Sequence, residues 1–84
     1  MKLVTPVKAL GKVIVELREL HGLDQGQLAR AAKLSKAHLN KIEKGKQSTV
    51  GLEVLSRLAM VFGITSAALT VLIELQMQRS KKSR

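Results

Sequence analysis

Apolar residues recur at helical spacing along most of this chain, and this pattern restricts the fold more than any other feature. The spacing predicts helices over residues 6–21, 25–32, 36–44, 52–62 and 66–78. Residues that cap helix N-termini stand at the start of four of these segments: Thr5, Asp24 with Gln27 as a capping box, Ser35, and Thr65 or Ser66. Glycines suited to helix ends follow three segments, at Gly22, Gly45 and Gly63. Since no stretch alternates as a strand does, the sequence predicts an all-α fold of five helices.

The charge of the chain indicates a polyanionic partner. Its 84 residues include 15 Lys and Arg against 6 acids, which gives a net charge of +9. Such an excess is typical of proteins that bind nucleic acid, an anionic membrane surface or the ribosome. Aromatic residues make up only 1% of the chain, so Leu, Val, Ile and Ala are expected to fill the core.

The length of the chain fits one domain over residues 1–78, followed by a basic tail over 79–84. We expect this tail to be disordered, or to serve as a non-specific DNA-binding arm. The absence of cysteine excludes disulfides and a cysteine zinc site, and it is consistent with the cytoplasm. Thr5-Pro6 and Lys8 break the apolar run of the N-terminus, which therefore does not resemble a signal peptide. The longest uncharged stretch, Leu58 to Ile73, is shorter than the roughly 20 residues that span a bilayer, so no membrane association is expected.

The stretch from Leu28 to Lys46 combines two short predicted helices with six positive charges and a single acid. The two helices are joined by about three residues, which is the spacing of a helix-turn-helix. At about 100° per residue, one face of the second helix carries Lys36, Ala37, Asn40, Lys41 and Lys44. Leu39 and Ile42 lie opposite. This helix is therefore expected to bury two aliphatic side chains and to expose a face with three lysines and no acid.

The stretch LDQGQLARAAKLSKAHLNKIEKGK resembles the helix-turn-helix domain of lambda-repressor-like regulators, the Cro/repressor or xenobiotic-response-element family. The features that carry the resemblance are Arg18, Gln25, Leu28-Ala29, Leu34-Ser35, Ile42-Glu43 and Gly45. The similarity extends over roughly Leu10 to Leu69. The chain departs from the family pattern at Lys33, where a left-handed glycine is usual. The loop after Gly45 is also one residue longer than the commonest pattern and lacks its proline.

The resemblance implies a role for each matching residue. The base-reading positions are occupied by Lys36, Ala37 and Lys41. The positions that meet phosphates are occupied by Gln25, Asn40, Lys44 and Lys46. Arg18 and Glu43 match a family pair that ties the first helix to the third through a partly buried ion pair.

The same resemblance implies a sequence-specific regulator of transcription that binds double-stranded DNA, most often a repressor acting as a homodimer on an inverted repeat. Apolar residues of the last helix, Leu69, Leu72 and Ile73, are the predicted dimer interface. One alternative is an antitoxin that binds a toxin protein and regulates its own operon, and another is a basic adaptor or RNA-binding module. Neither histidine has an acid partner and no phosphate-binding glycine loop follows a strand, so no catalytic activity, cofactor or metal is expected.

Overall fold

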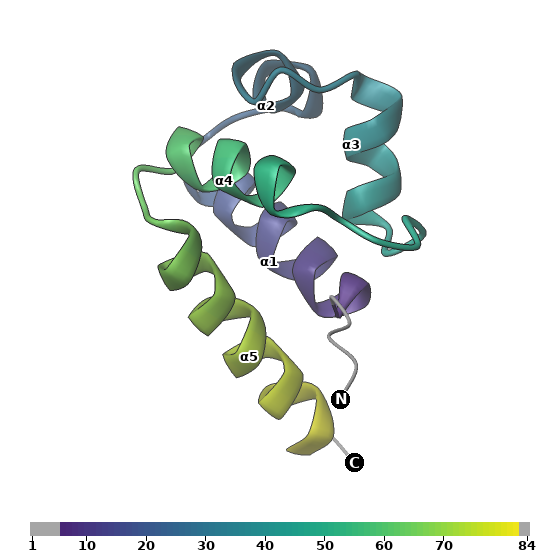
Figure 1. Ribbon diagram of the computed structural model, residues 1–84, viewed down its shortest axis with the longest axis vertical. Coiled ribbons are helices and arrows are strands. Elements are labelled where there is room, and N and C mark those ends of the chain that lie inside the picture. Colours follow the sequence, from purple (N-terminus) through teal and green to yellow (C-terminus); the bar gives the residue numbers. More distant parts are fainter. Residues whose placement is uncertain (1–5, 83–84) are drawn as a thin grey trace.

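The computed structural model describes residues 6–82, with the side chains of 6–79, and folds into five α-helices (Figure 1). In chain order they are α1 (Val7–Leu20), α2 (Gln25–Ala31), α3 (Lys36–Glu43), α4 (Leu52–Val61) and α5 (Ser66–Lys82). The described residues contain no strand. The predicted all-α architecture of five helices is therefore confirmed.

Three of the helices begin where the sequence predicts, and a local side-chain hydrogen bond caps each of them. Asp24 accepts a hydrogen bond from the backbone N–H of Gln27 at 2.8 Å, and the Gln27 side chain accepts one from the Asp24 N–H at 2.9 Å, which completes the capping box. The Ser35 hydroxyl accepts a hydrogen bond from the backbone N–H of His38 at 3.0 Å. Thr65 does the same for α5, so that Thr65 and not Ser66 is the cap.

The other predicted cap, Thr5, lies outside the described residues. Pro6 occupies the N-cap of α1 and not its first helical position, since the helix begins at Val7. The glycines that follow α1, α3 and α4 all take the left-handed conformation, and Lys33 takes it after α2 with a φ of 60°. A lysine in this conformation costs about 1–2 kcal/mol because its Cβ approaches the following carbonyl oxygen.

The last helix is longer than predicted. The sequence predicts its end near residue 78, whereas α5 continues to Lys82 and so includes residues 79–82 of the expected basic tail. Two physical reasons favour this extension. No glycine or proline interrupts residues 79–82, and positive charges are stabilised at a helix C-terminus by the helix dipole.

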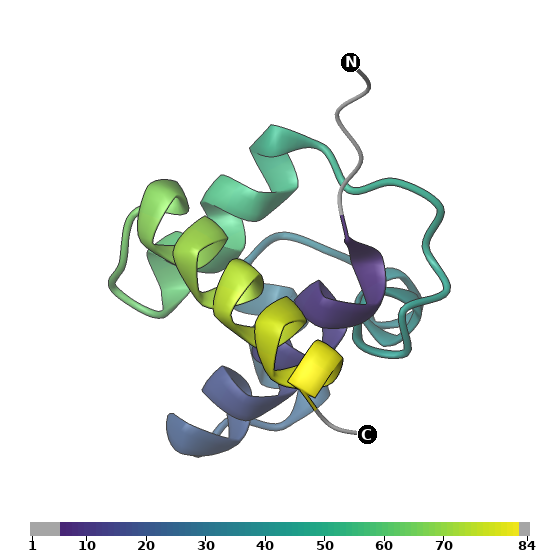
Figure 2. The same ribbon diagram turned by 90° about the horizontal axis from the view of Figure 1, so that it is seen from below.

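The first helix lies at the centre of the fold (Figure 1). It contacts α3 on one side and α5 on the other, while α2 packs on α3 and α4, and α4 packs on α5. A view turned by 90° shows α5 lying along α1, with α3 on the far side of α1 (Figure 2). The two ends of the fold are therefore distinct, one formed by α2 and α3 and the other by α5.

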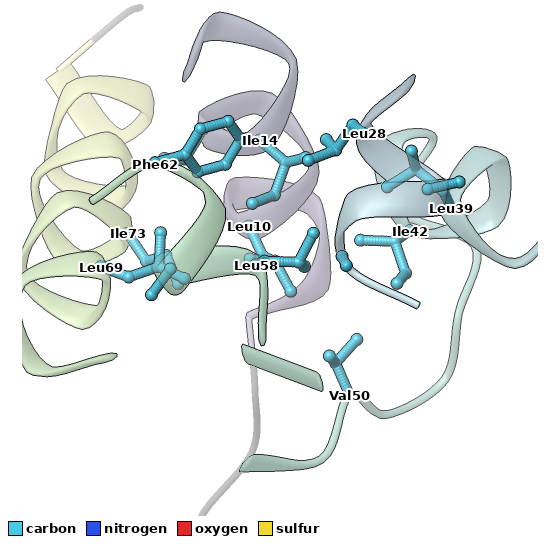
Figure 3. Packing of buried hydrophobic residues seen from close by; sticks show 14 residues of the cluster. Leu10, Ile14, Leu28, Leu39, Ile42, Val50, Leu58, Phe62, Leu69 and Ile73 are labelled. Atoms are coloured by element: carbon cyan, nitrogen blue, oxygen red, sulfur yellow. The ribbon is translucent and has the colours of Figure 1, made fainter. Parts of the chain in front are cut away.

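Aliphatic side chains from all five helices form a single core, together with Val50 and Phe62 (Figure 3). The largest fully buried side chains are Leu10, Ile14, Leu28, Leu39, Ile42, Leu58 and Leu69. Two of them, Leu39 and Ile42, attach α3 to the rest of the protein. Within residues 6–82 no single helix is long and apolar enough to cross a membrane, and α4 and α5 meet that test only as a pair bent by 96°.

Candidate nucleic-acid interface

The second and third helices form a helix-turn-helix, with a turn that is closed by backbone hydrogen bonds. The N–H of Leu34 donates to the carbonyl of Ala29 at 2.8 Å, and the N–H of Lys33 donates to that of Arg30 at 3.2 Å. The left-handed conformation of Lys33 makes this pairing possible. Because both helices also bury apolar residues in the common core, the angle between them is set by packing on α1 and α4.

The exposed face of α3 carries the residues that the sequence placed there. Leu39 and Ile42 are 0% and 1% exposed and point into the core. The opposite face shows solvent the side chains of Lys36, Ala37, Lys41 and Lys44, with Asn40 half-buried at its edge. Lys46 is exposed just beyond the helix. The predicted separation of a buried and an exposed face is therefore confirmed.

The positive charges of this face are not paired with acids. In the described part of the chain, the ion pairs are those of Arg18 with Glu43 and of Arg57 with Glu53. The one acid on α3, Glu43, points to the interior, and its side chain is only 4% exposed. The surface of α3 therefore presents an uncompensated positive potential, which attracts a polyanion.

A paired arginine holds the C-terminal end of α3 to α1. The Nε of Arg18 donates to Oε2 of Glu43 at 2.7 Å, and its Nη2 donates to Oε1 at 3.2 Å. The remaining nitrogen, Nη1, donates to the carbonyl of Leu23 at 3.1 Å. Hydrogen bonding to Glu43 raises the pKa of Arg18 above its usual value, against the opposing effect of burial, so the guanidinium stays charged at neutral pH. The expected pair between the first and third helices thus forms as a bidentate contact.

The side chain of Gln25 extends this network to the first turn of α2. Its Nε2 donates to Oε1 of Glu43 at 2.9 Å, and its Oε1 accepts a hydrogen bond from Nδ2 of Asn40 at 3.5 Å. Gln25 therefore links α2 to α3, and its amide nitrogen, which carries two N–H groups, engages one of them in these contacts.

The structure corrects the prediction of the dimer interface, because two of the three predicted residues belong to the core of the protomer. Leu69 and Ile73 are 1% and 4% exposed, and only Leu72, which is half-buried, approaches the surface. The side of α5 that faces α1 and α4 is centred on Leu69 and Ile73, so these side chains cannot reach a second chain. The apolar residues that α5 does expose are Val71 at 53%, Leu75 at 49% and Met77 at 38%.

A shallow pocket of about 130 Å³ lies between α1 and α5, on the side of α1 away from α3. Its lining consists of Val13, Glu16, Leu17, Leu20, Leu72 and Arg79. Leu20 is 81% exposed at its edge. This apolar surface with one acid and one base is separate from the lysines of α3.

Sequence reasoning missed two residues of α1 that lie against the helix-turn-helix. A Cβ on Gly11 would stand 2.6 Å from the carbonyl oxygens of both Ile42 and Glu43, so only glycine allows α1 to approach the end of α3 this closely. Lys8 lies one turn earlier, and its atoms are those that a Cβ on Gly45 would meet. A glycine inside an otherwise helical pattern was the available signal for Gly11.

Comparison with known proteins agrees with this geometry. A family model described as helix-turn-helix matches residues 14–69. No curated protein matches the chain. The restriction-modification controller protein C.AhdI from Aeromonas hydrophila is 28% identical, with a TM-score of 0.70 over 75% of this chain and 94% of that chain.

Two further solved structures share the fold at lower identity. The clp gene regulator ClgR from C. glutamicum is 24% identical with a TM-score of 0.77, covering 89% of this chain and 96% of that chain. The master regulator for biofilm formation SinR, solved in complex with DNA, is 24% identical with a TM-score of 0.68, covering 73% of this chain and 97% of that chain.

Proposed function

We propose that this chain, which belongs to the helix-turn-helix family of DNA-binding transcriptional regulators, is a repressor that binds an inverted-repeat operator as a homodimer. The observation that carries the proposal is the exposed face of α3, where unpaired lysines surround Ala37 while the only acid of the helix is turned inward. The controller protein that resembles this chain at 28% identity supports a regulatory role.

In this proposal α3 enters the major groove and reads base edges. Lys36 and Lys41 are exposed on one face and can donate hydrogen bonds to O6 and N7 of guanine, while the methyl group of Ala37 can contact the methyl group of thymine. A lysine presents a point charge and not a bidentate fork, so the preference for guanine should be weaker than an arginine would give.

Phosphate contacts flank the base-reading positions. Lys44 and Lys46 are exposed at the C-terminal end of α3, and Asn40 stands between them and Gln25. Gln25 has one amide N–H free to donate to a phosphate oxygen while the other is held by Glu43. Such contacts orient the protein on the duplex and contribute affinity that does not depend on sequence.

The homodimer is proposed through the surface formed by α1 and α5 and not through Leu69 and Ile73. Leu20 and Leu72 line the pocket between the two helices, and Val71 and Leu75 are about half exposed on α5. Glu16 and Arg79 place opposite charges on the same patch, which suits a two-fold interface in which each residue meets its opposite on the partner. Dimerisation would also supply a second recognition helix, which would read the other half-site of the operator.

The test is selection of bound sites from a random duplex pool, followed by sedimentation of the free protein. We expect a palindromic consensus and a dimer that Leu75→Glu converts to a folded monomer. The matched control is Leu52→Glu, at an exposed leucine on α4 where the charge should leave the dimer intact. A wild type that stays monomeric up to about 100 μM would contradict the homodimer. Equal affinity for duplex RNA and duplex DNA would contradict the operator.

A toxin protein is the alternative occupant of the same apolar surface, on which Leu20 is 81% exposed. The chain would then be monomeric when free. It would form a stable complex with the product of a neighbouring gene, and Leu75→Glu would disrupt that complex without changing DNA affinity.

A further inference from the structure

The N-terminal half of α1 is held against the end of α3 more tightly than helix packing usually allows. A Cβ built on Gly11 would stand only 2.6 Å from the carbonyl oxygens of Ile42 and Glu43. Seven residues later on the same face, Arg18 holds the carboxylate of Glu43 at 2.7 Å. Two fixed points therefore set the position of α1 relative to the last turn of α3.

This close approach brings Lys8 beside the loop that follows α3. The three atoms nearest to a Cβ built on Gly45 all belong to Lys8: Cγ at 3.0 Å, Cα at 3.1 Å and Cβ at 3.5 Å. Gly45 stands between Lys44 and Lys46 in the chain, and the loop is held in place because the N–H of Lys46 donates to the carbonyl of Lys41 at 2.9 Å. Lys8 therefore lies beside Lys44 and Lys46, the two lysines already expected to contact phosphates.

The three lysines form an exposed cluster, and the ion pairs of the described chain include none of them. Like charges gathered in this way repel one another, and an anion placed among them removes that cost. The stem of Lys8 rests on Gly45, which limits where its ammonium group can go. A duplex presents one phosphate charge per about 1.7 Å of helix axis, or about 3.4 Å of axis on each strand, to any such cluster.

We propose that Lys8 of α1 is a further DNA-binding residue, which holds a backbone phosphate together with Lys44 and Lys46. This inference rests on the proposed DNA-binding function and extends it from the helix-turn-helix to the first helix. The contact lies at the C-terminal end of α3, next to the loop, and so concerns a phosphate beside the bases that α3 reads. It adds affinity for any duplex and no preference for sequence.

The test is Lys8→Met, which keeps the packing of the stem on Gly45 and removes the charge. Binding to a mixed-sequence 30-base-pair duplex is measured as a function of salt. Loss of one phosphate contact should make the slope of log K against log salt shallower by about 0.9, and it should weaken binding about eightfold at 0.1 M salt. The matched control is Lys12→Met. Lys12 is an exposed lysine one turn further along the same helix, so this variant loses the same charge at a different place.

A phosphate-specific measurement separates a contact from a general effect of charge. A methylphosphonate replaces single phosphates along a site selected from the random pool. At one position it should weaken the wild type more than it weakens Lys8→Met, because the variant has already lost one of the three lysine contacts to that phosphate.

An unchanged salt slope for Lys8→Met would overturn the inference, and so would an equal change for Lys12→Met. Either result would leave the proposed function intact as long as the wild type binds duplex DNA. A wild type that does not bind duplex DNA would instead overturn the proposed function itself.

Discussion

Replacement of Arg18 by methionine tests whether the ion pair with Glu43 holds the recognition helix in place. In the wild type the Glu43 carboxylate accepts two hydrogen bonds from Arg18 and one from Gln25, and its side chain is 4% exposed. Arg18→Met leaves this buried charge with the Gln25 amide alone, because methionine fills part of the space but donates nothing. The bond from Arg18 to the carbonyl of Leu23 is lost as well.

The expected cost follows from these contacts. Breaking a buried pair by removal of one partner costs about 3–5 kcal/mol, and the 16% exposure of the Arg18 side chain places this case near 3 kcal/mol. For a domain of this size, 1 kcal/mol shifts the melting temperature by about 4–8 °C, so Arg18→Met should lower it by about 12–24 °C.

The assay is thermal unfolding followed by circular dichroism, at one fixed protein concentration because a dimer makes the transition depend on concentration. The variant Arg18→Met/Glu43→Met serves as the control. Removal of both charges eliminates the unpaired carboxylate, so the double variant should be more stable than Arg18→Met by about 1–2 kcal/mol. A melting temperature within about 4 °C of the wild type, or a double variant that is less stable than the single one, would refute this account of the pair.

Four further substitutions test other parts of the structure. Lys41→Ala should cost about 1–3 kcal/mol on the selected site and relax the preference at one base in each half-site, whereas a loss equal on all sequences would identify Lys41 as a phosphate contact. Lys44→Ala should weaken binding to every duplex and make the salt slope shallower, and competition with unrelated DNA checks this. Gly11→Ala should lower stability by about 1–3 kcal/mol in urea unfolding because its Cβ meets backbone oxygens, while the control Gly26→Ala, with no contact closer than 3.4 Å, should be neutral or stabilising. Gln76→Leu should raise stability by about 1 kcal/mol, because the buried Gln76 Oε1 has no hydrogen-bond partner among the described residues; an unchanged or lower stability would contradict this.

The starts of α2, α3 and α5 were predictable because they depend on residues only three or four positions apart. Asp24 and Gln27 need nothing beyond their own turn to form a capping box, and Ser35 and Thr65 cap in the same local way. The exposed face of α3 was predictable for a similar reason, since Leu39 and Ile42 alone determine which side is buried.

The exposed face of α5 was not predictable because the apolar residues of this helix are spread widely around it. Leu69 and Ile73 differ from Leu75 and Val71 in burial only through the positions of α1 and α4, which the sequence of α5 does not contain. The same limit applies to Gly11, whose role depends on the carbonyl groups of a helix 31 residues later in the chain. Contacts of this kind are set by tertiary packing, to which local patterns are insensitive.

The left-handed turn at Lys33 has a consequence for how this domain can change over evolution. A lysine at a φ of 60° costs about 1–2 kcal/mol, but glycine would lose about 0.5–1 kcal/mol more backbone entropy on folding. The two choices therefore differ by little in net stability, and the exposed turn between α2 and α3 is a position where a positive charge can be gained or lost almost neutrally. The charge of this turn can thus change without the compensating substitutions that a change in the core would require.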